Sequence, residues 1–388
     1  AQRNDVDALS VKVSSISSQI DLLAFDHSLE TLAGRLAQIY KASLRDTGTG
    51  PIVMLDMEAY HDLELTFALL QRVLERSDML KVRAGIVLQA YLPDSHALQR
   101  ELIHWSSARV ARGGQPVRLR IVKGANLAQE RVDSSLAGYP LPIYNRKEEV
   151  DASYRRMVLR AAEAESQRAV QVGLASHNLF DIAMGLVLRA QHDLGHGLQI
   201  ELLEGMATPL QRALRSLRVP VLMYAPIVDE GELNSGIAYL VRRLDENTSE
   251  ENFLRSSFEM QLGTRSWERE RSRFRAGFSL VDSVGEEPSR AGHPAHARDR
   301  RTEHNGTHAP DRSFFNAPDT DFSRVANRIW IHEALQRRQE AAAPTTGSLI
   351  AGRECRTGDA VDAFDPSRPG AAPYRYHLSD AAEIEQAL

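Results

Sequence analysis

The sequence predicts an α/β protein whose main part is a (β/α)8 TIM-like barrel that lacks its first strand. Seven short apolar runs recur along the chain, and a longer stretch with helical periodicity follows each of them. The sequence contains no glycine fingerprint of a dinucleotide-binding sheet, and an open doubly wound sheet usually has fewer strands. On the pattern alone, a seven-stranded open sheet stays open as the alternative.

The elements follow in chain order. The candidate strands are residues 8–14, 51–56, 85–90, 117–122, 170–175, 198–203 and 219–224. Between them, amphipathic stretches such as residues 29–42, 62–75 and 95–112 are long enough to be the crossover helices that parallel strands require. Because a closed barrel of this type has eight strands, we expect the missing one to lie upstream of Ala1.

The composition changes near residue 284, where the chain becomes polar, charged and interrupted by proline and glycine. This predicts a flexible linker over residues 284–314. The linker contains His293, His296, His304 and His308. We expect no metal site there, because neither a helix nor a carboxylate shell presents these histidines. Residues 321–342 are predicted to form a helix, so the predicted domains are residues 1–283 and 315–388.

Charge and cysteine content exclude several classes of protein. The net charge of −5 shows no excess of basic residues such as nucleic-acid-binding proteins have, so we expect no nucleic-acid partner. Cys355 is the one cysteine, which excludes an internal disulfide framework and a cysteine-based zinc site. No apolar run approaches the ~18 residues of a membrane-spanning helix. We therefore expect a cytoplasmic protein, and the start at Ala1 without methionine indicates a segment of a longer chain.

Polar residues stand at the end of nearly every candidate strand, where a barrel carries its catalytic groups. They are Lys12, Asp56, Gln89, Arg120, Lys123, Ser176, His177, Asn178, Glu201 and Tyr224. To pack its interior, a barrel needs only bulky apolar side chains on its strands. Buried ion pairs or solvated rim residues would account for any one of them. Together they favour a ligand site.

A second signal follows the last candidate strand, in the stretch from Tyr239 to Asn247. Offsets of three, four and seven residues place Tyr239, Arg242, Arg243 and Glu246 on one face of a helix. Two adjacent arginines can receive a carboxylate or a phosphate, and Glu246 can fix a guanidinium group. A solvated, salt-bridged helix face has the same spacing, so both interpretations stay open at this point.

Several motifs occur in the right order for one known family. They are Ser10-Val-Lys12-Val-Ser14, Leu55-Asp56-Met-Glu58, Leu88-Gln89-Ala-Tyr91, Arg120-Ile-Val-Lys123-Gly124-Ala125, Ser176-His177-Asn178, Gly205-Met206, Tyr224-Ala-Pro226 and the Tyr239 motif. Over about residues 6–255 the chain resembles the flavin barrel of the proline dehydrogenase family. It resembles most the long bacterial bifunctional enzymes of the proline utilization A type. Residues 316–388 resemble the start of an aldehyde dehydrogenase domain.

The resemblance implies FAD-dependent oxidation of L-proline to 1-pyrroline-5-carboxylate, on the route from proline to glutamate, with electrons passed to a quinone. It implies that Lys12, Arg242 and Arg243 hold the carboxylate of proline. Tyr224 and Tyr239 would complete the substrate site, Glu246 would orient the arginines, and Asp56 would pair with the cations of the site. The residues implied to hold FAD are Gln89, Arg120, Lys123, Gly124, Ser176, His177 and Asn178.

The resemblance also implies peripheral membrane contact through the quinone and an oligomeric full-length parent. The chain departs from the family at Asn126, where an aromatic residue is usual, and at Ser176, where threonine is more usual. Two alternatives remain: oxidation of a related cyclic amino acid such as hydroxyproline, and a catalytically silent incomplete barrel. The catalytic residues of the aldehyde dehydrogenase would lie beyond Leu388, since Cys355 comes too early to be its nucleophile. We therefore expect this chain to oxidise proline poorly until the upstream segment is restored, and not to reduce NAD.

Overall fold

The computed structural model describes most of the chain. The described residues are 6–44, 50–228, 231, 233–234, 236–237, 239–241, 252–257, 260–290 and 319–388. They form two compact units, Ala1–Ser323 and Arg324–Leu388. No helix among them is both long enough and apolar enough to span a bilayer.

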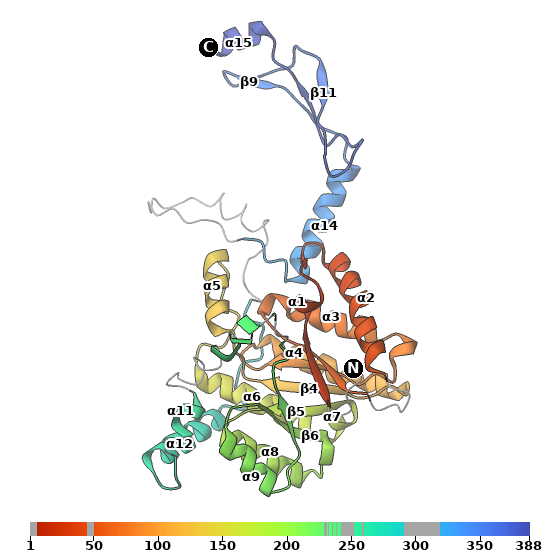
Figure 1. The fold of residues 1–388 in the computed structure, drawn as a ribbon. Coiled ribbons are helices and arrows are strands. Elements are labelled where there is room, and N and C mark those ends of the chain that lie inside the picture. The colour runs from red at the N-terminus through yellow and green to blue at the C-terminus, as the bar shows by residue number, and fades with distance from the viewer. Residues whose placement is uncertain are drawn as a thin grey trace. The chain divides into compact units, whose positions relative to one another are not determined.

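The first unit is built on a single seven-stranded sheet whose spatial order follows the chain order from β1 to β7. The strands are β1 (Ala8–Lys12), β2 (Ile52–Asp56), β3 (Ala84–Gln89), β4 (Val117–Val122), β5 (Val170–Ala175), β6 (Leu198–Leu203) and β7 (Val221–Tyr224). Every neighbouring pair is parallel, and among the described residues β1 and β7 are the two edges. The sheet curls with helices around it (Figure 1), which makes it a partial (β/α)8 barrel, as predicted.

Helices connect successive strands and cover the outside of the sheet. Those of the first unit are α1 (Val13–Ile16), α2 (Phe25–Ser43), α3 (Leu63–Leu74), α4 (Asp94–Ala111), α5 (Leu127–Ala137), α6 (Lys147–Ala162), α7 (Ala164–Ala169), α8 (Leu179–Gln191), α9 (Thr208–Ser216), α11 (Phe253–Ser257) and α12 (Arg265–Ser279). Short 3₁₀ turns occur at η1 (Tyr60–Asp62), η2 (Ser77–Met79) and η3 (Gly195–Gly197). The helix α12 packs against α6 and α8, which lie beside it in Figure 1.

The inner strands β2 to β6 are largely buried on both faces, as parallel strands between helices and a barrel interior are, whereas the edge strands β1 and β7 are mostly half-buried. In β2, Ile52, Val53, Met54 and Leu55 are all buried. This explains why the strands were visible in the sequence as short continuous apolar runs. The predicted strand bounds agree with the observed ones to within two residues. Differences of two residues occur at the start of β7 and at the end of β1, which ends at Lys12 because Val13–Ile16 forms a helix.

Beside α3 and α4, one arginine binds backbone carbonyl oxygens and no carboxylate within the described part of the chain. The side chain of Arg109 is fully buried. Its guanidinium donates to the carbonyl oxygens of Leu74 at 2.6 Å, Met79 at 2.8 Å, Leu80 at 3.0 Å, Gln115 at 3.2 Å and Val82 at 3.4 Å. Burial lowers the pKa of Arg109 to about 10, so the group stays charged at neutral pH. It satisfies the carbonyl groups at the end of α3 and in the turns that follow.

We expect Arg109→Met to lower the free energy of unfolding by about 3–5 kcal/mol, because several buried and half-buried carbonyl oxygens would lose a charged donor together. Urea denaturation followed by circular dichroism measures the loss. The control is Arg112→Met at the exposed C-cap of the same helix, which should cost less than about 0.5 kcal/mol. Equal losses in the two variants would contradict the role of the buried guanidinium.

The first residues of the segment predicted as a linker are bound to the barrel. Glu286 accepts ion pairs from Arg156 at 2.7 Å and Arg160 at 2.5 Å on α6. Arg290 pairs with Asp321 at 2.6 Å inside the same unit. The residues between Arg290 and 319 lie outside the described part of the chain, and so do the four histidines predicted within the linker. The described part of the segment, 284–290, is therefore anchored by buried and half-buried charges.

The second unit consists of one helix, short strands and a C-terminal helix. Its elements are α14 (Val325–Glu340), β8 (Thr345–Thr346), β9 (Ser348–Ile350), β10 (Arg353–Cys355), β11 (Ala360–Asp362), β12 (Arg375–His377) and α15 (Ala381–Ala387). The strands β9 and β10 form an antiparallel pair, and β11, β12 and β8 form a three-stranded sheet. Ile350 and Ala363 are the buried apolar residues of this unit, all of which is described, whereas Leu349 and Phe364 are exposed.

Candidate functional site

The polar residues predicted from the strand ends lie at one end of the barrel. Lys12, Asp56, Gln89 and Tyr224 are the last residues of β1, β2, β3 and β7, and Lys123 and Ser176 directly follow β4 and β5. Because all the strands are parallel, their carboxyl ends meet at the same edge of the sheet. We call this edge the mouth of the barrel. It is where enzymes of this architecture carry their active sites.

Arg120 lies two residues before the end of β4 and is 7% exposed. Its Nε donates to Oε2 of Glu201 at 2.6 Å, and its Nη1 donates to Oγ of Ser10 at 3.2 Å. Nη1 also lies 3.9 Å from Oδ1 of Asp56. The guanidinium carbon stands 3.8 Å from the centre of the Tyr224 ring. A guanidinium held by a carboxylate, a hydroxyl and an aromatic face has a fixed plane and a fixed charge.

Three buried polar atoms at the mouth make no hydrogen bond among the described residues. They are Oε1 of Gln89, Nη2 of Arg120 and the hydroxyl of Tyr224. A buried polar atom without a partner costs about 1–3 kcal/mol, so such atoms are rare unless a ligand or a water satisfies them. Burial raises the pKa of Tyr224 to about 12, which keeps the phenol neutral and able to donate. Three such atoms at one edge of the sheet leave donors and an acceptor that a ligand can use.

Lys12 and Asp56 lie opposite each other in the β1–β2 register. Nζ of Lys12 pairs with Oε1 of Glu58 at 3.1 Å, and Oγ of Ser14 donates to the other oxygen of Glu58 at 2.5 Å. Burial raises the pKa of Asp56, while the charges of Arg120 and Lys12 act in the opposite direction. The sequence motif contained Glu58 without a role. In the structure it is the direct partner of Lys12.

Lys123 lies between two carboxylates that sequence reasoning missed. Its Nζ is 2.5 Å from Oδ1 of Asp151 on α6 and 2.8 Å from Oδ2 of Asp181 on α8. Burial works against the charge of Lys123, but Asp181 and Asp151 raise its pKa above the ordinary value. Asp181 also accepts from Nε of Arg155 at 2.9 Å. A lysine predicted at a buried strand end needs a counterion, and this is the signal that could have led to the helix carboxylates.

The Ser176, His177 and Asn178 side chains have structural partners. Oδ1 of Asn178 accepts from the backbone N–H groups of Phe180 at 2.9 Å and Asp181 at 3.4 Å, so it caps α8. Oγ of Ser176 accepts from the backbone N–H of Asn178 at 3.1 Å. Nε2 of His177 accepts from the backbone N–H of Leu203 at 3.3 Å, which joins the ends of β5 and β6. These bonds fix the loop after β5 at the rim of the mouth.

Burial lowers the pKa of His177 to about 4, whereas an unfolded histidine titrates near 6.5. The unfolded chain therefore binds a proton between about pH 6.5 and 4 that the folded chain does not, and stability falls as the pH falls through this window. We expect wild type to lose about 1–2 kcal/mol more than His177→Gln between pH 7 and pH 5. Urea unfolding at several pH values measures the difference. His104 is exposed, so His104→Gln is the control and should show the wild-type change of unfolding free energy with pH. If His177→Gln also showed the wild-type change, the buried neutral state of His177 would be contradicted.

Gly124 has a backbone requirement of its own. Its φ is +125°, and a Cβ at this position would lie 2.5 Å from the ring of Tyr91. Glycine is therefore needed for both the conformation and the packing. Asn126, which stands where the resembled family has an aromatic residue, donates from its side chain to the carbonyl of Glu58. This contact links the loop after β4 to the loop that carries the partner of Lys12.

The arginine motif is only partly within the described residues. Tyr239 has helical backbone, whereas Arg242, Arg243 and Glu246 lie outside the described part of the chain. The predicted carboxylate clamp therefore stays a prediction. Within the described residues, no group of three or more histidine, cysteine, aspartate or glutamate side chains is arranged to hold a metal ion.

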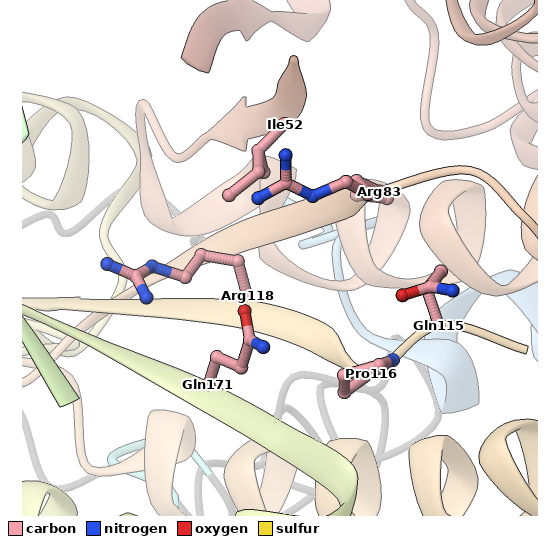
Figure 2. Close-up of a pocket in the computed structure, with 7 residues that line it drawn as sticks. Ile52, Arg83, Gln115, Pro116, Arg118 and Gln171 are labelled. Carbon is pink, nitrogen blue, oxygen red and sulfur yellow. The ribbon is translucent and has the colours of Figure 1, made fainter. Parts of the chain in front are cut away.

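A small cavity of about 20 Å³ lies at the other end of the barrel. Its lining residues are Ile52, Arg83, Ala84, Gln115, Pro116, Arg118 and Gln171. These residues come from the amino ends of β2 to β5 or from the turns before them. In Figure 2 the Arg118 side chain extends along the sheet away from Gln115 and Pro116. A water-sized space at the amino ends of the strands is a packing feature rather than an active site.

The fold and the mouth together define a class: a (β/α) barrel whose carboxyl-terminal mouth holds a buried arginine, half-exposed lysines and buried polar atoms. The family model of proline dehydrogenase matches residues 1–256 of the 388. The chain belongs to the proline dehydrogenase family.

Two solved structures and one curated protein give the comparison more detail. Proline utilization A (PutA) from Corynebacterium freiburgense is 34% identical, with a TM-score of 0.71 over 84% of this chain and 30% of its own. PutA from Bdellovibrio bacteriovorus, inactivated by N-propargylglycine, is 26% identical, with a TM-score of 0.77 over 97% of this chain and 36% of its own. Human mitochondrial proline dehydrogenase 1 is 32% identical over 136 residues, which are 34% of this chain and 22% of that protein. The chain thus spans only about a third of these relatives or less.

Proposed function

We propose that this chain carries the FAD-dependent oxidation of L-proline to 1-pyrroline-5-carboxylate. The observation that carries the proposal is the mouth itself, where Gln89, Arg120 and Tyr224 keep buried polar atoms without partners among the described residues. Membership in the proline dehydrogenase family supplies the substrate class. A fixed guanidinium beside these atoms suits a cofactor that becomes negatively charged when reduced.

The residues at the mouth fit FAD. Arg120 is a buried cation and Lys123 is a half-buried one held by two carboxylates, and Gln89 and Tyr224 add an amide and a phenol to the same edge. Gln89, Arg120, Lys123 and Gly124 would hold the cofactor, together with Ser176, His177 and Asn178 of the loop after β5. When bound, FAD supplies the acceptor for a hydride that leaves the proline ring carbon next to the nitrogen.

The protein residues have positioning and electrostatic work to do. Lys12 would bind the proline carboxylate together with Arg242 and Arg243, while Glu246 would orient the two arginines. Tyr224 and Tyr239 would close the sides of the substrate site, and Asp56 would balance the cations. Buried Arg120 would stabilise negative charge at the mouth in a low-dielectric setting, where a fixed charge has a large effect.

The second unit and the later electron acceptor complete the proposal. We infer that residues 315–388, which include the second unit, form the start of an aldehyde dehydrogenase domain, because the similarity to the Bdellovibrio PutA covers 97% of this chain and so extends past residue 256. In the full-length protein that domain would oxidise glutamate semialdehyde with NAD and complete the route to glutamate. Electrons from proline would pass to a quinone, through peripheral contact with the membrane, in an oligomeric full-length protein.

Steady-state reduction of an artificial dye tests the substrate assignment. In the full-length protein with FAD added, we expect L-proline to support dye reduction and 4-hydroxyproline to support it with a kcat/KM at least about tenfold lower, because an extra hydroxyl must find a partner in the site. D-Proline, which presents the carboxylate on the wrong face, is the control. Preference for hydroxyproline would replace the proposed substrate with the related cyclic amino acid.

A further inference from the structure

Two arginines of one strand share a single carboxylate inside the barrel. Arg118 and Arg120 are two residues apart on β4, so their side chains lie on the same face of the sheet. Glu201 comes from β6, the next strand but one. Its Oε1 accepts from Arg118 Nε at 3.1 Å and Nη2 at 2.9 Å, while its Oε2 accepts from Arg120 Nε at 2.6 Å. The Glu201 side chain is 1% exposed.

The strand between them makes this contact possible. Gly173 lies on β5, paired in register with Arg120 on one side and Gln199 on the other. A Cβ at Gly173 would lie 2.0 Å from Oε1 of Glu201. The backbone of Gly173 does not have a positive φ, so its conformation does not require glycine. What requires glycine there is the carboxylate that crosses over it.

Glu201 thereby determines how Arg120 is presented. The Nε edge of the guanidinium is held by Glu201, Nη1 is held by Ser10, and the Tyr224 ring lies 3.8 Å from the guanidinium carbon. Nη2 has no hydrogen-bond partner among the described residues. We propose that Glu201 is a positioning residue that reaches over Gly173 to fix the Arg120 guanidinium, so that Nη2 is kept for the negative charge of the reduced cofactor. This inference rests on the proposed flavin function.

The competing explanation is that Glu201 only neutralises the two arginines. The two explanations predict opposite signs. If Glu201 only reduces the positive charge near the cofactor, Glu201→Gln stabilises the reduced, negative form and raises its midpoint potential. If Glu201 holds Arg120 in place, the same variant releases the guanidinium and lowers the potential. Gly173→Ala separates position from charge, because the new methyl group displaces the flexible end of Glu201 and keeps every charged group.

The experiment measures FAD affinity by fluorescence titration and the midpoint potential by spectroelectrochemistry, in wild type, Glu201→Gln, Gly173→Ala and Arg120→Met. Arg118→Met is the matched control, because it removes the other cation bound to Glu201 and leaves the Arg120 contact intact. We expect Glu201→Gln, Gly173→Ala and Arg120→Met each to lower the midpoint potential by about 30 mV, a tenfold change in a two-electron equilibrium, and to weaken FAD binding. Arg118→Met should stay within a third of that shift. Circular dichroism checks the fold, and Gly173→Ala carries the test if Glu201→Gln does not fold.

The outcomes separate the two levels of the proposal. Wild type that binds no FAD would overturn the proposed function and this inference with it. In a second outcome, wild type binds FAD and Arg120→Met shifts the potential. If Glu201→Gln then raises the potential and Gly173→Ala leaves it unchanged, the positioning role of Glu201 is overturned and the proposed function is not. Lowered potentials in both variants support the positioning role.

Discussion

Arg120→Met is expected to reduce the kcat of FAD-supported proline oxidation by about 100- to 1,000-fold. The guanidinium is buried, held by Glu201 and stacked on Tyr224, and keeps an N–H group for the ligand. Loss of one fixed charge-stabilising donor in a water-excluded site has an effect of this size. Rates are measured with saturating proline and FAD, so that weaker binding does not enter the result.

The matched control is Arg118→Met, two residues earlier on the same face of β4. Both arginines bind Glu201, but Arg118 also donates to the side chain of Gln199 at 2.7 Å and lies deeper in the barrel. We expect its kcat to stay within about threefold of wild type, because its backbone lies two residues, about 7 Å, further from the mouth along β4 than that of Arg120, and its donors are taken up by Glu201 and Gln199. Equal losses in the two variants would show that barrel packing, rather than ligand contact, sets the rate.

Arg243→Met is expected to weaken proline binding by about 2–5 kcal/mol, the cost of removing one partner of a desolvated charge pair. Arg243 lies outside the described residues, and this expectation rests on the Tyr-x-x-Arg-Arg-x-x-Glu spacing. Proline affinity is measured from the concentration dependence of flavin reduction, and FAD affinity is expected to change less than threefold.

The control is Arg265→Met, which removes an exposed arginine at the start of α12. It should leave both affinities at the wild-type level. If Arg243→Met reduced flavin at wild-type proline concentrations, the carboxylate would be bound elsewhere in the mouth, with Lys12 as the first candidate.

The barrel was predictable because its inner strands, β2 to β6, are largely buried on both faces. Residues 117–122, 170–175 and 198–203 were predicted with the observed bounds, since their apolar runs begin and end with the strands. The polar residues that end the strands could also be placed together, because parallel strands bring their carboxyl ends to one edge. The start of α1 at Val13 was not predicted, because its apolar and polar residues continue the alternation of β1.

The partners of the site residues could not be predicted in the same way. Lys123 meets Asp151 and Asp181, which come from two different helices, and this pairing depends on how those helices pack. Glu201 was predicted to stand at a strand end, but its contact with both arginines depends on a glycine in the strand between them. Such contacts follow from the tertiary arrangement and have no periodic pattern in the sequence.

The most direct test of the central claim is an anaerobic titration of the FAD-loaded protein with L-proline, followed by visible absorbance. A flavin held beside Arg120, with proline bound at the same mouth, should lose its oxidised absorbance band as proline is added. The spectrum should return when a quinone analogue is supplied. A protein that binds FAD but keeps the full oxidised spectrum at saturating proline would contradict the account.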